Sequence, residues 1–179
     1  MKKLISLLLA AILLLTLAAC APADKDNADD IQPPVSNDPQ PEPAVPTDLV
    51  LEDVYQAILN AQEGQDPLVM FPEGNPDLIE SFYPGLSQIE LVQQAIYFPP
   101  VLGFVSEVLL VEVANPADVQ SVVEIFEARI EHGASDTTYP DVAAYWTTCA
   151  QVQSAGNYVA MIALPNGYTI PENVFELVG

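Results

Sequence analysis

Apolar residues recur with two different spacings along residues 48–179, and each spacing predicts a type of element. Residues 51–62 carry a stripe at i, i+3, i+4, i+7 and i+8, which is typical of an amphipathic helix. A second stripe runs through residues 116–132, where Asn115 can cap the first turn and Pro116 suits the first helical position. Gly133 is expected to end this helix. Shorter helical segments are expected at residues 76–83, 141–148 and 171–177.

Four segments rich in Val, Leu, Ile and Tyr are typical of strands, at residues 89–98, 105–113, 150–154 and 158–164. The last two flank Gly156 and Asn157, which favour a tight hairpin turn. The order α-ββ-α-ββ-α therefore predicts an α+β domain, in which a four-stranded, mainly antiparallel sheet has its helices packed on one face.

The N-terminus has the pattern of an export signal. Lys2 and Lys3 precede an uncharged run over residues 4–17, and these 14 residues fall short of the ~20 that a spanning helix needs. The stretch Leu17-Ala-Ala-Cys20 resembles the lipobox of bacterial lipoproteins. This resemblance implies cleavage between Ala19 and Cys20, acylation of the Cys20 thiol, and a location on the extracytoplasmic side of the cell membrane.

Composition divides residues 20–179 into a spacer and a domain. Residues 20–47 hold the expected lipidated cysteine and a segment with seven prolines and many polar residues, for which we expect disorder and about 30 Å of reach. Residues 48–179 suffice for one domain. The chain has 25 acidic and four basic residues, a net charge of −21, and loss of Lys2 and Lys3 with the signal peptide would make it −23. Such a charge excludes nucleic acid as a partner. It leaves the membrane, reached through a lipid anchor, and an envelope protein or neutral wall component.

The candidates for chemistry are few. His132 is the only histidine and falls in the last turn of its expected helix, where a positive charge suits the helix dipole. Cys149 lies in an apolar context that favours the core. A dyad of these two residues, or calcium on Asp136 and Asp141 near Glu131, are the alternatives. We therefore predict no catalytic residue, no metal ligand and no cofactor.

The turn between the first two strands is unusually apolar. Residues 97–104 contain three aromatic side chains, those of Tyr97, Phe98 and Phe104. If they are exposed, they form a candidate partner contact, because large exposed apolar patches mark interaction sites. If they fold over the sheet, they belong to the core.

Several local patterns resemble an uncharacterised bacterial lipoprotein family. They are Phe82-Tyr-Pro-Gly-Leu, the strand with Glu107, the helix over residues 117–130 and Gly156-Asn-Tyr-Val, within about residues 75–165. The resemblance implies a single extracytoplasmic domain of unknown function behind a lipobox. Together with the lack of a catalytic motif, it favours a non-catalytic binding or assembly module at the cell envelope. The alternative is a carboxylate-based hydrolase acting on cell-wall glycan or peptide.

Overall fold

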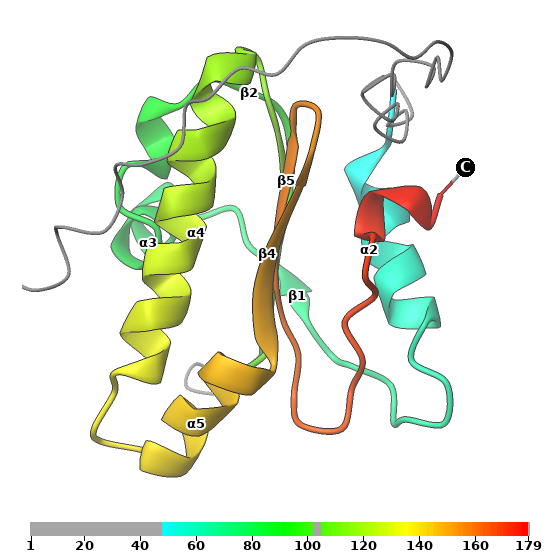
Figure 1. Cartoon of the computed structure of the whole chain (residues 1–179), viewed down its shortest axis with the longest axis vertical. Coiled ribbons are helices and arrows are strands. Elements are labelled where there is room, and N and C mark those ends of the chain that lie inside the picture. The colour runs from blue at the N-terminus through cyan, green and yellow to red at the C-terminus, as the bar shows by residue number, and fades with distance from the viewer. Residues whose placement is uncertain (1–47, 102–104, 179) are drawn as a thin grey trace, which may run out of the picture. The chain divides into compact units, whose positions relative to one another are not determined.

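A computed structural model describes residues 48–101 and 105–178, and these residues form an α+β domain around an open antiparallel sheet (Figure 1). The sheet has five strands in the order β1-β2-β3-β5-β4. The strands are β1 (Phe71–Pro72), β2 (Leu91–Phe98), β3 (Glu107–Val113), β4 (Ala150–Ala155) and β5 (Tyr158–Ala163). The helices are α2 (Leu51–Asn60), α3 (Pro76–Phe82), α4 (Val119–Ala134) and α5 (Pro140–Thr148). Short 3₁₀ turns are η1 (Leu86–Gln88), η2 (Pro116–Asp118) and η3 (Val174–Glu176). The predicted class and the antiparallel sheet are confirmed.

The expected count of four strands was wrong by one edge strand. β1 adds two residues to the sheet, where Phe71 pairs with Phe98 and Pro72 with Tyr97. A strand of this length gives no alternating pattern in the sequence, and a proline within it argues against a strand. The tertiary pairing to β2 creates the element.

The expectation that helices cover one face was also wrong. In Figure 1, α2 and the C-terminal segment lie on one side of the sheet, and α3, α4 and α5 lie on the other. The reason is visible in the central strands, because all six residues of β5 and six of the seven in β3 are buried. A strand that is apolar at successive positions has to be covered on both faces.

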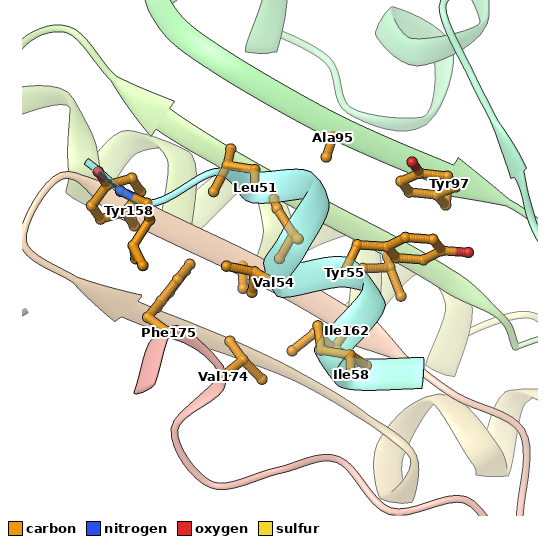
Figure 2. Packing of buried hydrophobic residues seen from close by; sticks show 14 of the residues in the cluster. Leu51, Val54, Tyr55, Ile58, Ala95, Tyr97, Tyr158, Ile162, Val174 and Phe175 are labelled. Atoms are coloured by element: carbon orange, nitrogen blue, oxygen red, sulfur yellow. Dashed lines mark hydrogen bonds between the residues drawn. The ribbon is translucent and has the colours of Figure 1, made fainter. Parts of the chain in front are cut away.

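The α2 face is built from apolar side chains on α2, the sheet and the C-terminal segment (Figure 2). Tyr55 stacks on Tyr97 with ring centroids 3.5 Å apart and planes inclined by 2°. Gln93 of β2 fixes the start of α2, since its Nε2 donates to the Leu49 carbonyl at 2.7 Å and its Oε1 accepts from the Leu51 N–H at 3.2 Å. The helix is thus placed by packing and by one amide.

The helix over residues 116–132 begins as predicted and ends differently. The Asn115 side chain accepts the Ala117 N–H at 3.2 Å, so the cap is confirmed, although the first turn is the 3₁₀ turn η2. The helix α4 continues through Gly133 to Ala134. Gly133 is needed for a different reason, because a Cβ atom there would lie 2.5 Å from the Trp146 ring of α5. The glycine permits close helix packing and does not terminate α4.

Candidate functional site

The face of the sheet that is covered by α3, α4 and α5, the α4 face, contains a buried ion pair. Glu107 begins β3, is 4% exposed and points toward α4. Arg129 of α4 donates from Nε to Glu107 Oε2 at 3.1 Å and from Nη2 to Glu107 Oε1. Tyr83, which follows α3, donates from its hydroxyl to Glu107 Oε2 at 2.5 Å. The carboxylate therefore receives three hydrogen bonds, two from the Arg129 side chain on α4 and one from Tyr83 just after α3.

Two aromatic rings enclose the guanidinium. The Arg129 Cζ atom lies 4.9 Å from the Phe82 ring centroid and 4.3 Å from that of Trp146. Contacts of this kind are attractive because the face of an aromatic ring is electron-rich, and they strengthen when water is excluded. Arg129 thus connects α3, α5 and β3 from its position on α4.

A local turn holds Phe82 and Tyr83 in place. Gly85 has a φ of +94°, a conformation that favours glycine, and its N–H donates to Glu80 Oε1 at 2.8 Å. This backbone hydrogen bond is the main reason that the pKa of the Glu80 carboxyl is lowered. The Phe-Tyr-Pro-Gly motif therefore has a structural role, because it delivers two aromatic side chains to the ion pair.

Burial shapes the titration of the network. Desolvation, followed by the negative charge of Glu107, raises the pKa of Tyr83 well above its ordinary value of 10.0. Burial by itself lowers the pKa of Arg129, but the hydrogen bonds and charge of Glu107 outweigh it and raise that pKa. The phenol and the guanidinium therefore both keep their protons at neutral pH.

A pocket of about 650 Å³ opens beside this network, between the end of α3 and one side of α4. This volume lies in the range of small-ligand pockets in proteins. Its lining is apolar at several positions and carries a few polar groups, among which Glu124 supplies the carboxylate and Arg129 and His132 the basic side chains. The full set is Ser81, Phe82, Pro84, Ser121, Glu124, Ile125, Ala128, Arg129 and His132. The arrangement can hold a ligand of mixed apolar and polar character.

Two of the three aromatic residues of the proposed partner contact, Tyr97 and Phe98, do not have the exposure that the contact required. Tyr97 is 8% exposed and belongs to the core of the α2 face, and Phe98 is 4% exposed and belongs to the core of the α4 face. As neighbours in a strand they point to opposite faces, and both faces are covered. Phe104 lies outside the described residues. For Tyr97 and Phe98 the core alternative is therefore the right one.

His132 and Cys149 occupy separate environments. His132 is exposed in the last turn of α4, as expected, and lines the α3–α4 pocket. Cys149 is half-buried against the core of the α4 face, and its sulfur lies 3.5 Å from the Thr148 hydroxyl. The histidine is not among the hydrogen-bond partners of that thiol within residues 48–101 and 105–178.

The acids considered for calcium are not gathered into a site. Asp136 accepts the Thr138 N–H at 2.7 Å, and this hydrogen bond is the main reason that its pKa is lowered. Within the described residues, no group of three or more His, Cys, Asp and Glu side chains could hold a metal ion. The residues of the lipobox, Ala19 and Cys20, lie outside the described part of the chain. No helix of that part is long and apolar enough to span a bilayer.

Sequence reasoning missed the Tyr83–Glu107–Arg129 network, although two signals for it were present. Glu107 is one of two acids, with Glu112, in a strand that is otherwise largely apolar, and Arg129 is the only basic residue after Lys25 apart from histidine. An acid in an apolar strand and the single arginine of the domain are candidates for a buried pair, because an unpaired buried charge is costly.

Comparison with known proteins gives one match. A family model described as a domain of unknown function, DUF4358, matches residues 74–164. These residues run from just before α3 to just after β5, so they include the ion pair, its aromatic neighbours and the pocket. No curated protein and no solved structure shows a significant match.

Proposed function

The chain belongs to the DUF4358 family, and from that premise we propose that it is a lipid-anchored extracytoplasmic protein whose domain binds a partner at the cell envelope without catalysing a reaction. The observation that carries the proposal is the closed ion pair beside an open pocket. Glu107 and Arg129 form an ion pair with each other. The pocket beside this pair has mostly apolar walls and a few hydrogen-bonding groups. Such a recess suits recognition.

The alternative, a hydrolase with two carboxylates, has less support. That mechanism needs one carboxyl group as a general acid and a second carboxylate about 5 to 9.5 Å away. The lining of the α3–α4 pocket includes a single carboxylate, that of Glu124. The nearby Glu107 does not line the pocket, and both of its carboxylate oxygens accept hydrogen bonds from Arg129 or Tyr83.

The anchor is tested by labelling cells with radioactive palmitate. The Cys20→Ser variant is expected to lose the label and to remain uncleaved, because the thiol is the acylated atom. Cys149→Ser is the matched control and is expected to keep the label and the processed size. If Cys20→Ser is still processed at the same position and stays on the membrane, the lipoprotein assignment is wrong.

The binding role is tested by filling the pocket. Ala128 is exposed on α4 and lines the pocket, so Ala128→Trp places an indole in the recess with little disturbance of the core. We expect this variant to lose the partner that the unmodified chain retains from solubilised native envelope. Gln56→Trp, at an exposed position of α2 on the opposite face, is the control and is expected to retain it. Equal retention by both variants would contradict a role for the pocket.

A further inference from the structure

The strand β4 lies at one end of the sheet, and among the strands of the described residues only β5 pairs with it (Figure 1). Its register with β5 pairs Ala155 with Tyr158 across the two-residue turn. In a hairpin of this kind the pair next to the turn exchanges both backbone hydrogen bonds, and every second pair after it does the same. The Leu164 N–H bonds the Cys149 carbonyl at 2.9 Å, which continues the same alternation.

This alternation decides which backbone groups face outward. Gln151, Gln153 and Ala155 bond to β5, so the N–H and C=O groups of Ala150, Val152 and Ser154 point away from the sheet. Within residues 48–101 and 105–178 these outward groups have no hydrogen-bond partner. They form a row to which one more strand can be added.

The edge of the sheet formed by β4 lacks the usual protection. At the opposite end of the sheet, β1 covers only Tyr97 and Phe98 of β2, and one of its two residues is Pro72, which lacks an N–H. The β4 edge is six residues long, with the sequence Ala-Gln-Val-Gln-Ser-Ala, and has no charged residue and no proline. Exposed edge strands of soluble proteins usually carry charged residues or prolines, which prevent pairing with other chains. The absence of both from β4 is consistent with an edge that binds another strand.

The surroundings of the β4 edge set the chemistry of an added strand. On the α2 face, Gln153 Nε2 donates to the Pro171 carbonyl at 2.7 Å, and this hydrogen bond holds the C-terminal segment against the sheet. On the α4 face, α4 and α5 leave a groove of about 450 Å³ alongside Val152. Its lining consists of apolar or small residues with two exposed acids, and the full set is Glu127, Ile130, Glu131, Ala134, Thr147 and Val152.

We propose that the β4 edge is a docking site for an extended peptide segment that pairs with β4 and presents an apolar side chain flanked by basic side chains to the groove. The outward backbone groups require an extended partner, because only a strand matches their spacing. The apolar side chain contacts Val152 and Ile130. The basic side chains of the peptide lie near Glu127 and Glu131. Residues 48–179 contain no lysine that could pair with these two acids.

A second copy of the chain fits this edge less well. Antiparallel pairing of two β4 strands would place the α4 helices of both copies on the same side of the joined sheet. Glu127 and Glu131 of one copy would then face the same acids of the other, and like charges repel. The groove shares no lining residue with the α3–α4 pocket, so the peptide site and the proposed pocket function succeed or fail independently.

The probe is the acetylated and amidated peptide Thr-Lys-Thr-Val-Thr-Lys-Thr, whose lysines and valine share one face of a strand. Its binding to the full chain in detergent micelles is measured by fluorescence anisotropy of an attached dye. Glutamate in place of both lysines is expected to weaken binding at least about tenfold, since two favourable pairs become repulsive. Raising the salt from about 0.1 M to about 1 M is expected to weaken binding of the lysine peptide.

Two pairs of variants test the site on the protein. Ser154→Pro removes an outward N–H and keeps the bonds to β5, whereas Ser154→Ala keeps that N–H and is the control. Glu127→Lys reverses a charge beside the groove, whereas Glu124→Lys makes the same change beside the other pocket. We expect Ser154→Pro and Glu127→Lys each to weaken binding at least about tenfold, and each control to change it less than about threefold.

Three results would overturn the proposal. The first is no binding of the lysine peptide to the full chain at millimolar concentration, and the second is equal binding of the lysine and glutamate peptides. The third is a dimer in sedimentation that Ser154→Pro abolishes, because the edge would then serve a second copy. If Ser154→Pro does not fold, the pair Glu127→Lys and Glu124→Lys decides by itself, with unchanged binding by Glu127→Lys contradicting the proposal.

Discussion

The two faces of the sheet are covered by helices but are held together by different chemistry. On the α2 face the core is apolar, and the carboxylates that accept from its Tyr97 hydroxyl and its Gln93 amide belong to Glu52, which is exposed, and Glu112, which is half-buried. On the α4 face a carboxylate and a guanidinium are buried together among aromatic rings. The same strand, β3, supplies both faces through alternate residues.

The difference shows how each layer is specified. In the part of the chain that the structure describes, the α2 face has a single α-helix, and its apolar stripe packs on the sheet. The α4 face has to bring α3, α4 and α5 into one arrangement, and Arg129 contacts a residue on or next to each of them. A buried ion pair adds little net stability, but separation of its partners is expensive. It therefore acts against alternative packings of the three helices.

The largest expected effect comes from a matched pair of neighbouring aromatics in β2. Phe98→Ala on the α4 face and Tyr97→Ala on the α2 face are each expected to lower the free energy of unfolding by about 3 to 5 kcal/mol, because both side chains are buried. Urea denaturation measures the change. A loss below about 1 kcal/mol for either variant would mean that its side chain is not packed in the core.

Separating the ion pair is expected to affect the α4 face alone. Arg129→Met fills most of the same space but leaves Glu107 buried without its cation, which is expected to cost about 3 to 5 kcal/mol of unfolding free energy. The double variant Glu107→Leu with Arg129→Met removes both charges and is expected to recover at least half of that loss. If the double variant is as unstable as Arg129→Met, the cost arises from lost packing around the guanidinium and not from an unpaired charge.

Two tyrosine hydroxyls allow the faces to be compared at a finer level. Tyr83→Phe removes a hydrogen bond to a charged carboxylate and is expected to cost about 1.5 to 3 kcal/mol, whereas Tyr158→Phe removes a neutral bond from the Leu49 N–H and is expected to cost about 0.5 to 1.5 kcal/mol. Equal losses would contradict the distinction between the faces.

Tyr83 also predicts how the free energy of unfolding depends on pH in the alkaline range. The raised pKa of Tyr83 in the folded state means that its contribution to stability is complete below pH 10 and is lost as the pH rises further. In a titration followed by tyrosinate absorbance, Tyr83 is expected to ionise together with unfolding, as is Tyr97, whose pKa is also raised by burial and by its hydrogen bond to Glu52. The amplitude of this last step is expected to fall by one tyrosine in Tyr83→Phe, and an unchanged amplitude would contradict the role of burial at Tyr83.

A further expected effect tests the contact between α4 and α5. An alanine normally stabilises a helix by about 1 kcal/mol relative to glycine, but Gly133→Ala would press a methyl group against Trp146. We expect a net loss of about 1 to 3 kcal/mol, as for other overpacked sites. Trp146→Leu is expected to reverse the sign, so that alanine at position 133 becomes neutral or stabilising in that background. A stabilising effect in the original background would show that the ring moves away without cost.

The sequence by itself determined the elements that depend on local pattern. The stripe on residues 51–62 became α2, the Asn115 cap is present, and the strand segments became β2 to β5 within a few residues of the expected bounds. These features were accessible because helix and strand periodicity and capping act over a few neighbouring residues.

Only the tertiary structure decided the features that depend on residues far apart in the chain. It added β1 by pairing to β2, covered the second face of the sheet, and turned Gly133 from an expected terminator into a contact with Trp146. It also brought Tyr83, Glu107 and Arg129 together across 24 and 22 residues of sequence. No local pattern encodes such a meeting, because the partner that satisfies a buried charge is chosen by the packing of whole elements.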